Sequence, residues 1–227
     1  MRHPRVLVTG FCDWRELGET ADLWRCRDNT SGRLLTGEAT TSATPNFAGP
    51  LVRHLQQCDE LAADFALLPV LWGTFYRLSL SGFDALIHLG LGRQAPGLLL
   101  LENGAINRRE RRDAAGKLPK TPVIEDLGPP SRPLSKAASA SLHRLTKDHS
   151  VRGYQLQLAS PRPENVYLCN ETHYLSLQAT AKLSHQLGRE IRSYFIHLPA
   201  VDQAALPQLG AALAGIIRAL MSDVSAP

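Results

Sequence analysis

Apolar positions along the chain follow two patterns, and together they predict strands alternating with helices. Continuous apolar runs indicate buried strands, and alternation of apolar with polar positions indicates a strand with one covered face. Such patterns occur over residues 5–11, 65–71, 83–90, 154–158 and 194–199. Apolar positions at helical spacing predict helices over residues 46–57, 75–80, 134–147, 171–186 and 208–221, the first of them capped by Asn46. At 227 residues the chain can form one α/β domain with a sizeable core, and we expect a single domain.

The stretch from residue 15 to residue 44 departs from this alternation. It is polar, rich in turn-forming residues and poor in apolar periodicity. Loops of this length without regular structure are usually functional lids or disordered segments. We therefore expect an irregular inserted loop here. Its Trp24 covers a nearby site, packs on a neighbouring subunit or packs only against its own loop.

The composition is that of a soluble globular protein, with 44% hydrophobic and 20% charged residues. The formal charge of +4 is modest, and the dense basic cluster at residues 108–112 is more typical of a solvated loop than of a nucleic-acid site. No segment approaches the ~18 consecutive apolar residues of a membrane helix, and no signal-peptide pattern opens the chain. We expect a cytoplasmic protein that binds neither nucleic acid nor membrane.

The cysteines bear on both the compartment and the chemistry. Cys12, Cys26, Cys58 and Cys169 are irregularly spaced and include no Cys-X-X-Cys pair. A disulfide scaffold or a structural zinc site is therefore not expected. Reduced thiols suit an enzyme that uses a thiolate.

Cys169 stands where an apolar run meets a predicted helix. Residues 166–168 are Val, Tyr and Leu, and the helical spacing begins at about Glu171, so Cys169 lies near a helix N-terminus. The unpaired backbone N–H groups and the helix dipole favour an anion there, and hence the thiolate. Because a lone cysteine is more often an inert buried residue, position alone does not assign a nucleophile.

Two polar residues stand at the ends of other apolar runs. His197 is near the end of the run 194–199, and the carboxyl ends of strands are where α/β sheets place their sites. Glu102 directly follows four leucines, a setting in which a carboxylate is rarely tolerated unless it is paired or active. If the fold brings Cys169, His197 and Glu102 together, they form a nucleophile, a base and an orienting acid.

The motifs around these residues resemble those of the pyroglutamyl peptidase I family, cysteine peptidases that remove an N-terminal pyroglutamate (5-oxoproline) from peptides. The resemblance rests on short motifs in the right order: residues 7–11 (Leu-Val-Thr-Gly-Phe), Glu102 with residues 105–107 (Ala-Ile-Asn), Cys169-Asn170 with Tyr174, and residues 195–199 (Phe-Ile-His-Leu-Pro). It implies Cys169 as nucleophile, His197 as base and Glu102 as orienting acid, with no metal or cofactor. It also implies homo-oligomers and a three-layer α/β/α domain with a twisted, mostly parallel, mixed sheet, a fold that resembles the nucleoside phosphorylases.

The resemblance further implies a substrate pocket for small peptides that begin with pyroglutamate. The positions expected to line it are Phe11, Trp14, Val70, Tyr167 and Leu168. Arg112 best matches an arginine close to the family's active site, where a cation would support the thiolate or a carboxylate.

On this hypothesis the Cys169 thiolate attacks the amide carbonyl after pyroglutamate, His197 protonates the leaving amine, and water hydrolyses the acyl-enzyme. Alternatives stay open. The thiol could act on another cyclic or N-blocked amide, because the residues after Phe11 are Cys-Asp-Trp where the family has Pro-Phe-Gly-Gly. A non-catalytic binding protein would be expected to have lost one member of the triad, and a nucleoside phosphorylase activity rests on analogy of fold alone. His173, four residues after Cys169, is a rival base or, with Cys169, a metal ligand.

Overall fold

A computed structural model of the protein describes residues 3–17, 20–26, 29–37, 45–147, 150–222 and 224, and these are organised around one mixed sheet. The strands of this sheet are β1 (Arg5–Leu17), β2 (Thr20–Arg25), β3 (Ala62–Pro69), β4 (Ala85–Leu91), β5 (Leu98–Glu102), β8 (Ser150–Val151), β9 (Tyr154–Ala159) and β10 (Arg192–Leu198). Their order is β2-β1-β4-β10-β5-β9-β8, and β3 pairs with β1. The strands β1, β3, β4 and β10 run parallel, whereas β5 is antiparallel to β10 and parallel to β9. A separate ribbon joins β6 (Gly104–Ile106) to β7 (Ser131–Pro133).

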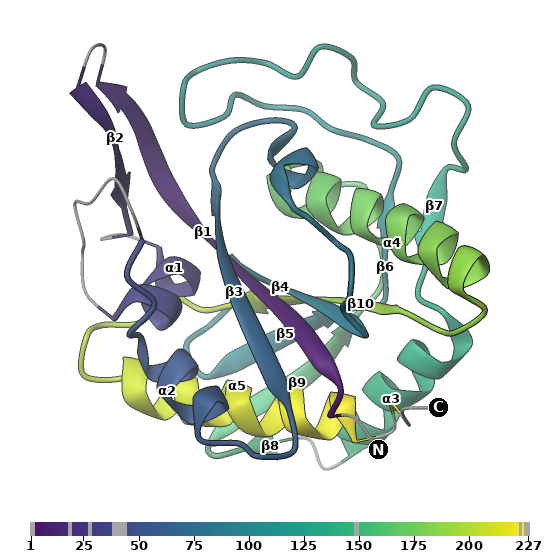
Figure 1. The fold of residues 1–227 in the computed structure, drawn as a ribbon. Helices are drawn as coiled ribbons and strands as arrows, with labels where there is room; N and C mark the ends of the chain where they lie inside the picture. The colour runs from purple at the N-terminus through teal and green to yellow at the C-terminus, as the bar shows by residue number, and fades with distance from the viewer. Residues whose placement is uncertain are drawn as a thin grey trace.

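Helices cover both faces of the sheet. They are α1 (Thr30–Thr36), α2 (Pro50–Gln56), α3 (Lys136–Lys147), α4 (Leu168–Leu187) and α5 (Leu206–Met221), with one 3-10 turn, η1 (Thr74–Arg77). On one face α5 packs with α1, α2 and α3, and on the other lies α4 with the β6–β7 ribbon (Figure 1). The predicted three-layer α/β/α fold with a mostly parallel, mixed sheet is confirmed. Among the described residues, no helix is long and apolar enough to cross a membrane.

The two central strands position the candidate site. Every residue of β10 is buried, as are all but the last of β4, which explains their continuous apolar sequences. They pair in parallel, with His197 opposite Gly90. The antiparallel β5 places Leu100 opposite His197, so Glu102 lies two residues further toward the amino end of β10. Glu102 is therefore inside the sheet rather than at its edge.

Most of the predicted elements are confirmed, but two helices are shorter than their apolar spacing indicated. The helix predicted from residue 46 begins at Pro50 after an N-cap at Gly49, because a proline is well suited to the first helical position. Residues 75–80 form only η1, since Leu78 is already extended. The strands β3, β4, β9 and β10 and the helices α3, α4 and α5 agree with the predicted ranges to within three residues at each end.

Residues 15–44 are not irregular where the structure describes them, so that expectation was wrong. The strand β1 continues to Leu17 and forms an antiparallel hairpin with β2. The helix α1 follows, capped by the Asn29 side chain, and it buries Leu34 and Leu35 completely. The residues of the hairpin beyond Cys12 do not alternate between apolar and polar, and a seven-residue helix is too short for a clear period, which is why the sequence pattern missed them. Residues 38–44 and the side chain of Trp24 lie outside the described part.

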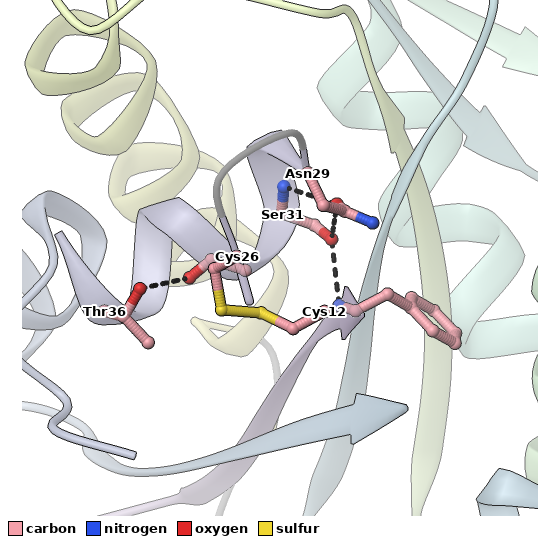
Figure 2. Close-up of a disulfide and its surroundings, with 7 residues drawn as sticks. Cys12, Cys26, Asn29, Ser31 and Thr36 are labelled. Carbon is pink, nitrogen blue, oxygen red and sulfur yellow. Dashed lines mark hydrogen bonds between the residues drawn. A yellow bond between two sulfur atoms is a disulfide. The ribbon is translucent and has the colours of Figure 1, made fainter. Parts of the chain in front are cut away.

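A disulfide between Cys12 and Cys26 closes this hairpin (Figure 2). Both cysteines are fully buried, and a Cβ atom on Gly32 of α1 would stand only 2.1 Å from the Cys12 sulfur. The bond therefore fastens the middle of β1 to the residue that follows β2, against α1. The expectation of reduced thiols, drawn from the irregular cysteine spacing, was therefore wrong for Cys12 and Cys26. A cytoplasmic location stays a prediction, and a disulfide favours an oxidising compartment instead.

We expect the double substitution Cys12→Ala and Cys26→Ala to lower the melting temperature by roughly 10 °C. The bond closes a short loop, and such a cross-link stabilises a protein by about 3 kcal/mol, mainly by restricting the unfolded chain. Thermal unfolding without reductant measures the effect. The matched control is Cys58→Ala, because Cys58 is a free, partly buried cysteine. An equal shift in the control, or four titratable thiols in the denatured wild type, would contradict the disulfide.

Candidate active site

Cys169 is the second residue of α4 and lies against the end of β4. The N-cap residue, Tyr167, makes no side-chain hydrogen bond to the helix, so no capping side chain occupies the first backbone N–H groups. A Cβ atom built on Gly90 would stand 3.0 Å from the Cys169 Sγ atom and 2.7 Å from the Phe195 ring. Glycine at position 90 therefore leaves the space that the thiol occupies.

His197 connects this thiol to a carboxylate. Its Nδ1 atom lies 2.8 Å from Oε1 of Glu102, and Cys169 is close enough to the His197 side chain to raise its pKa. His197 is in β10, directly opposite the Gly90 that makes room for the thiol. The structure thus brings together the three residues singled out by the sequence, with His197 hydrogen-bonded to Glu102 and close to Cys169.

The surroundings of His197 favour its protonated form. Burial alone lowers the pKa of His197, but hydrogen bonds with Cys169 and Glu102 and the charges of both residues raise it to about 9. At neutral pH the imidazole therefore carries a positive charge beside the sulfur. This arrangement places a proton donor beside the sulfur of Cys169.

Glu102 is held in a nearly closed environment. Its side chain is 1% exposed. The same Oε1 atom that contacts His197 lies 3.1 Å from Nη2 of Arg162, whereas Oε2 is buried and has no hydrogen-bond partner among the described residues. All of the described hydrogen bonding of this carboxylate is therefore directed through one oxygen.

The other two buried histidines near the site have different environments. His173 is buried on α4 with its ring 5.8 Å from that of Phe195, and its Nε2 atom has no hydrogen-bond partner among the described groups. Burial, with the nearby charges of His88 and His197, lowers the pKa of His173 to about 3. His88 lies 2.8 Å from both Thr9 and Ser176, and burial lowers its pKa to about 3. Both therefore stay neutral at physiological pH, and neither has the carboxylate partner that orients His197.

Metal binding by Cys169 and His173 has no geometric support in the described part of the chain. Within it, no three His, Cys, Asp or Glu side chains are grouped so that they could hold a metal ion.

An apolar cluster adjoins Cys169 and contains most of the residues expected to line the pocket. The cluster consists of Phe11, Leu68, Val70, Trp72, Leu78, Tyr167, Leu168, Cys169 and Phe195. Trp14 is in β1, but its side chain lies outside the described part. Trp72, which sequence reasoning missed, packs edge-on against Tyr167 with ring centroids 5.7 Å apart. Its indole N–H donates to the Lys117 carbonyl, a contact that no local sequence pattern signals.

Arg112 is placed differently from the expected cation. Its guanidinium donates to the Gly116 carbonyl, and its side chain is exposed. Arg109 instead pairs with α4, because its Nη1 atom is 2.5 Å from Oε1 of Glu171, two residues after Cys169. Glu171 is fully buried and also accepts from the Gly73 N–H. In a run of four arginines, the sequence alone did not indicate which one turns inward.

The remaining motif residues hold the long segment between β6 and β7, which runs beside α4 (Figure 1). The Asn170 side chain accepts from the Ile106 N–H and donates to the carbonyls of Ile106 and Arg108. Tyr174 donates to the Pro129 carbonyl, and the Asn107 side chain accepts from the backbone N–H of residues 124 and 125. The asparagines and tyrosine beside the triad therefore fix the backbone around it.

Comparison with known proteins gives a consistent result at the level of the fold. No protein-family model matches the chain, and no curated protein sequence matches it. The crystal structure of Bacillus amyloliquefaciens pyroglutamyl peptidase I is similar with a TM-score of 0.68 and 17% identity, over 99% of this chain and 100% of that one. The pyrrolidone carboxyl peptidase of Thermus thermophilus is similar with a TM-score of 0.60 and 26% identity, over 93% and 97% of the two chains.

A third similar structure is the pyrrolidone carboxyl peptidase of Fervidobacterium islandicum, with a TM-score of 0.63 and 20% identity, over 96% of this chain and 99% of that one. These similarities extend over nearly the whole length of both chains. The resemblance of the sequence motifs is therefore confirmed at the level of the fold, and the chain has the fold of the pyroglutamyl peptidases at a distant sequence identity.

Proposed function

We propose that the protein is a cysteine peptidase that removes N-terminal pyroglutamate from peptides, with Cys169 as nucleophile, His197 as acid and base, and Glu102 as orienting acid. The observation that carries the proposal is that His197 is hydrogen-bonded to Glu102 and lies opposite Gly90, beside which the Cys169 sulfur stands. The names of the similar structures support the same activity.

The chemistry proceeds through an acyl-enzyme. The Cys169 thiolate attacks the carbonyl carbon of the pyroglutamyl amide, and backbone N–H groups at the start of α4 stabilise the resulting oxyanion. The His197 imidazolium gives its proton to the amine as the C–N bond breaks. Neutral His197 then takes a proton from water, whose oxygen attacks the thioester and releases pyroglutamate, so that the thiolate–imidazolium pair is restored.

The apolar cluster beside Cys169 suits a compact ring without charge. Pyroglutamate has lost both the positive amino group and the negative side chain of glutamate, so it does not require charged partners. Phe11 and Tyr167 supply aromatic surface, and Val70 and Leu168 supply aliphatic surface. A substrate with a free, charged N-terminus would leave that charge unpaired in the same cluster, which is costly.

A substrate panel tests the proposal. The wild type, assayed under mild reducing conditions, is expected to release a fluorescent amine from a pyroglutamyl amide but not from a prolyl or an N-acetylalanyl amide. The prolyl compound has the same ring size with a charged amine, and the acetyl compound is uncharged without the ring. Two results together would contradict the catalytic proposal and favour a binding role. They are absence of turnover on the whole panel and slow alkylation of Cys169 by iodoacetamide.

A second candidate keeps the thiol chemistry and changes the acyl group to another cyclic or N-blocked amide. The observation that favours it is that β1 continues past Phe11 as a strand of a disulfide-closed hairpin. That hairpin occupies the sequence position where the family has its Pro-Phe-Gly-Gly segment. Rapid alkylation of Cys169 without pyroglutamyl turnover, or preference for the acetyl compound, is the outcome that selects this candidate.

A further inference from the structure

We infer that Arg162 is a positioning residue that shares the Glu102 carboxylate with His197 and so limits how tightly His197 holds its proton. The inference rests on the proposed function, because the proton in question is the one that the leaving amine receives. Arg162 was not among the site residues indicated by the sequence.

His197 and Arg162 both contact the same oxygen atom of Glu102. Oε1 of Glu102 lies 2.8 Å from Nδ1 of His197 and 3.1 Å from Nη2 of Arg162. The carboxylate is 1% exposed, whereas the Arg162 side chain is 45% exposed. The guanidinium therefore reaches from the protein surface to the buried oxygen on which the imidazole depends.

The loop that carries Arg162 is itself fixed in place. Residues on either side of Arg162 are prolines, whose rings restrict the backbone. The Arg162 carbonyl accepts from the Asn165 N–H, and Ala159 at the start of the loop accepts from the Asn103 N–H, next to Glu102. Since the same loop leads directly to the start of α4, it links the position of the guanidinium to that of Cys169.

Charge balance gives this contact its function. The ionisable groups that face His197 are Cys169 and His173 from α4 and Glu102 from β5, and Arg162 acts on it through Glu102. His173 is neutral at the relevant pH. A thiolate, an imidazolium and a carboxylate carry a net charge of minus one, and an unbalanced charge in a buried site is costly. The Arg162 guanidinium brings the cluster to zero.

Sharing also weakens the hold of the carboxylate on the imidazolium. The two cations contact the same oxygen, so each diminishes the attraction that the other experiences. Without Arg162 the full charge of Glu102 acts on His197, which then retains its proton to a higher pH. A proton held more tightly is transferred less readily to the leaving amine.

The test is the substitution Arg162→Gln, followed by NMR titration of the His197 imidazole, whose resonance is assigned by its absence from His197→Ala. The wild-type midpoint is expected at about pH 9. In Arg162→Gln the midpoint should move upward by on the order of half a pH unit, discounted for the partial exposure of the guanidinium. The value of kcat at neutral pH should fall a few-fold. Arg162→Lys, which keeps the positive charge, should restore the wild-type midpoint.

Arg5→Gln is the matched control. The Arg5 side chain is also 45% exposed and also pairs with one carboxylate, that of Asp64, but it lies at the amino end of β1. This variant should titrate like the wild type. An unchanged or lowered midpoint in Arg162→Gln, or an equal shift in Arg162→Lys, would overturn the inference. The titration needs no substrate, so an upward shift without pyroglutamyl turnover keeps the Arg162 assignment and rejects the substrate assignment alone.

Discussion

Replacing Cys169 by serine is expected to lower kcat/KM for a pyroglutamyl amide by at least about 10⁴-fold, because loss of a nucleophile from a triad removes most of its rate enhancement. A serine hydroxyl ionises far less readily than a thiol, so it is a much weaker nucleophile beside His197. The substitution changes one atom, and the space beside Gly90 accommodates the smaller oxygen without rearrangement. Steady-state kinetics on the fluorescent amide, with melting temperature as a check on folding, measure the effect.

Cys58→Ser is the internal control for this experiment. Cys58 and Cys169 are the two free cysteines of the chain, and both are partly buried. Cys58 follows α2, on the face of the sheet opposite α4. Replacing it by serine therefore makes the same chemical change away from Cys169, His197 and Glu102. The control should retain wild-type activity. If both variants lose activity equally, or if Cys169→Ser retains more than about 1% of the rate, Cys169 is not the nucleophile.

The sequence predicted the central strands and singled out Cys169, His197 and Glu102 because each depends on a local pattern. Continuous apolar runs exist in β4 and β10 because both strands are buried on two faces. Cys169 could be placed at a helix start because the twenty residues of α4 give a clear helical period. Glu102 was conspicuous because a carboxylate after four leucines requires a partner.

Other features could not be predicted because they depend on contacts between distant segments. The direction of β5 decides that Glu102 lies inside the sheet, and no residue within β5 encodes that direction. The Cys12–Cys26 bond requires a hairpin whose sequence beyond Cys12 does not alternate between apolar and polar residues. The choice of Arg109 over Arg112 depends on Glu171, which is 62 residues from Arg109. Arg162 gave no signal, because its importance comes from reaching Glu102, 60 residues away.

Replacing Glu102 by glutamine is expected to lower kcat by about 10³-fold with little change in KM, because the carboxylate does not touch the substrate. Glutamine keeps the shape of the side chain but removes the charge that helps to raise the pKa of His197. His197 therefore loses its proton at a lower pH, and the alkaline limb of the pH–rate profile should move below its wild-type position near pH 9. Arg162 strengthens this effect, because its guanidinium then faces the imidazole without an intervening negative charge.

Asp84→Asn separates this catalytic effect from the general cost of removing a buried acid. Asp84 is also almost fully buried and also pairs with an arginine, Arg189, but it precedes β4 at the opposite end of that strand from Gly90. This variant should lose thermal stability while its alkaline limb stays at the wild-type pH. If the alkaline limb of the pH–rate profile does not move in Glu102→Gln, or if the loss of activity appears in KM rather than kcat, Glu102 acts by packing. In that case the imidazolium of His197 would have to be sustained by the thiolate alone, and Arg162→Gln would leave the His197 midpoint unchanged.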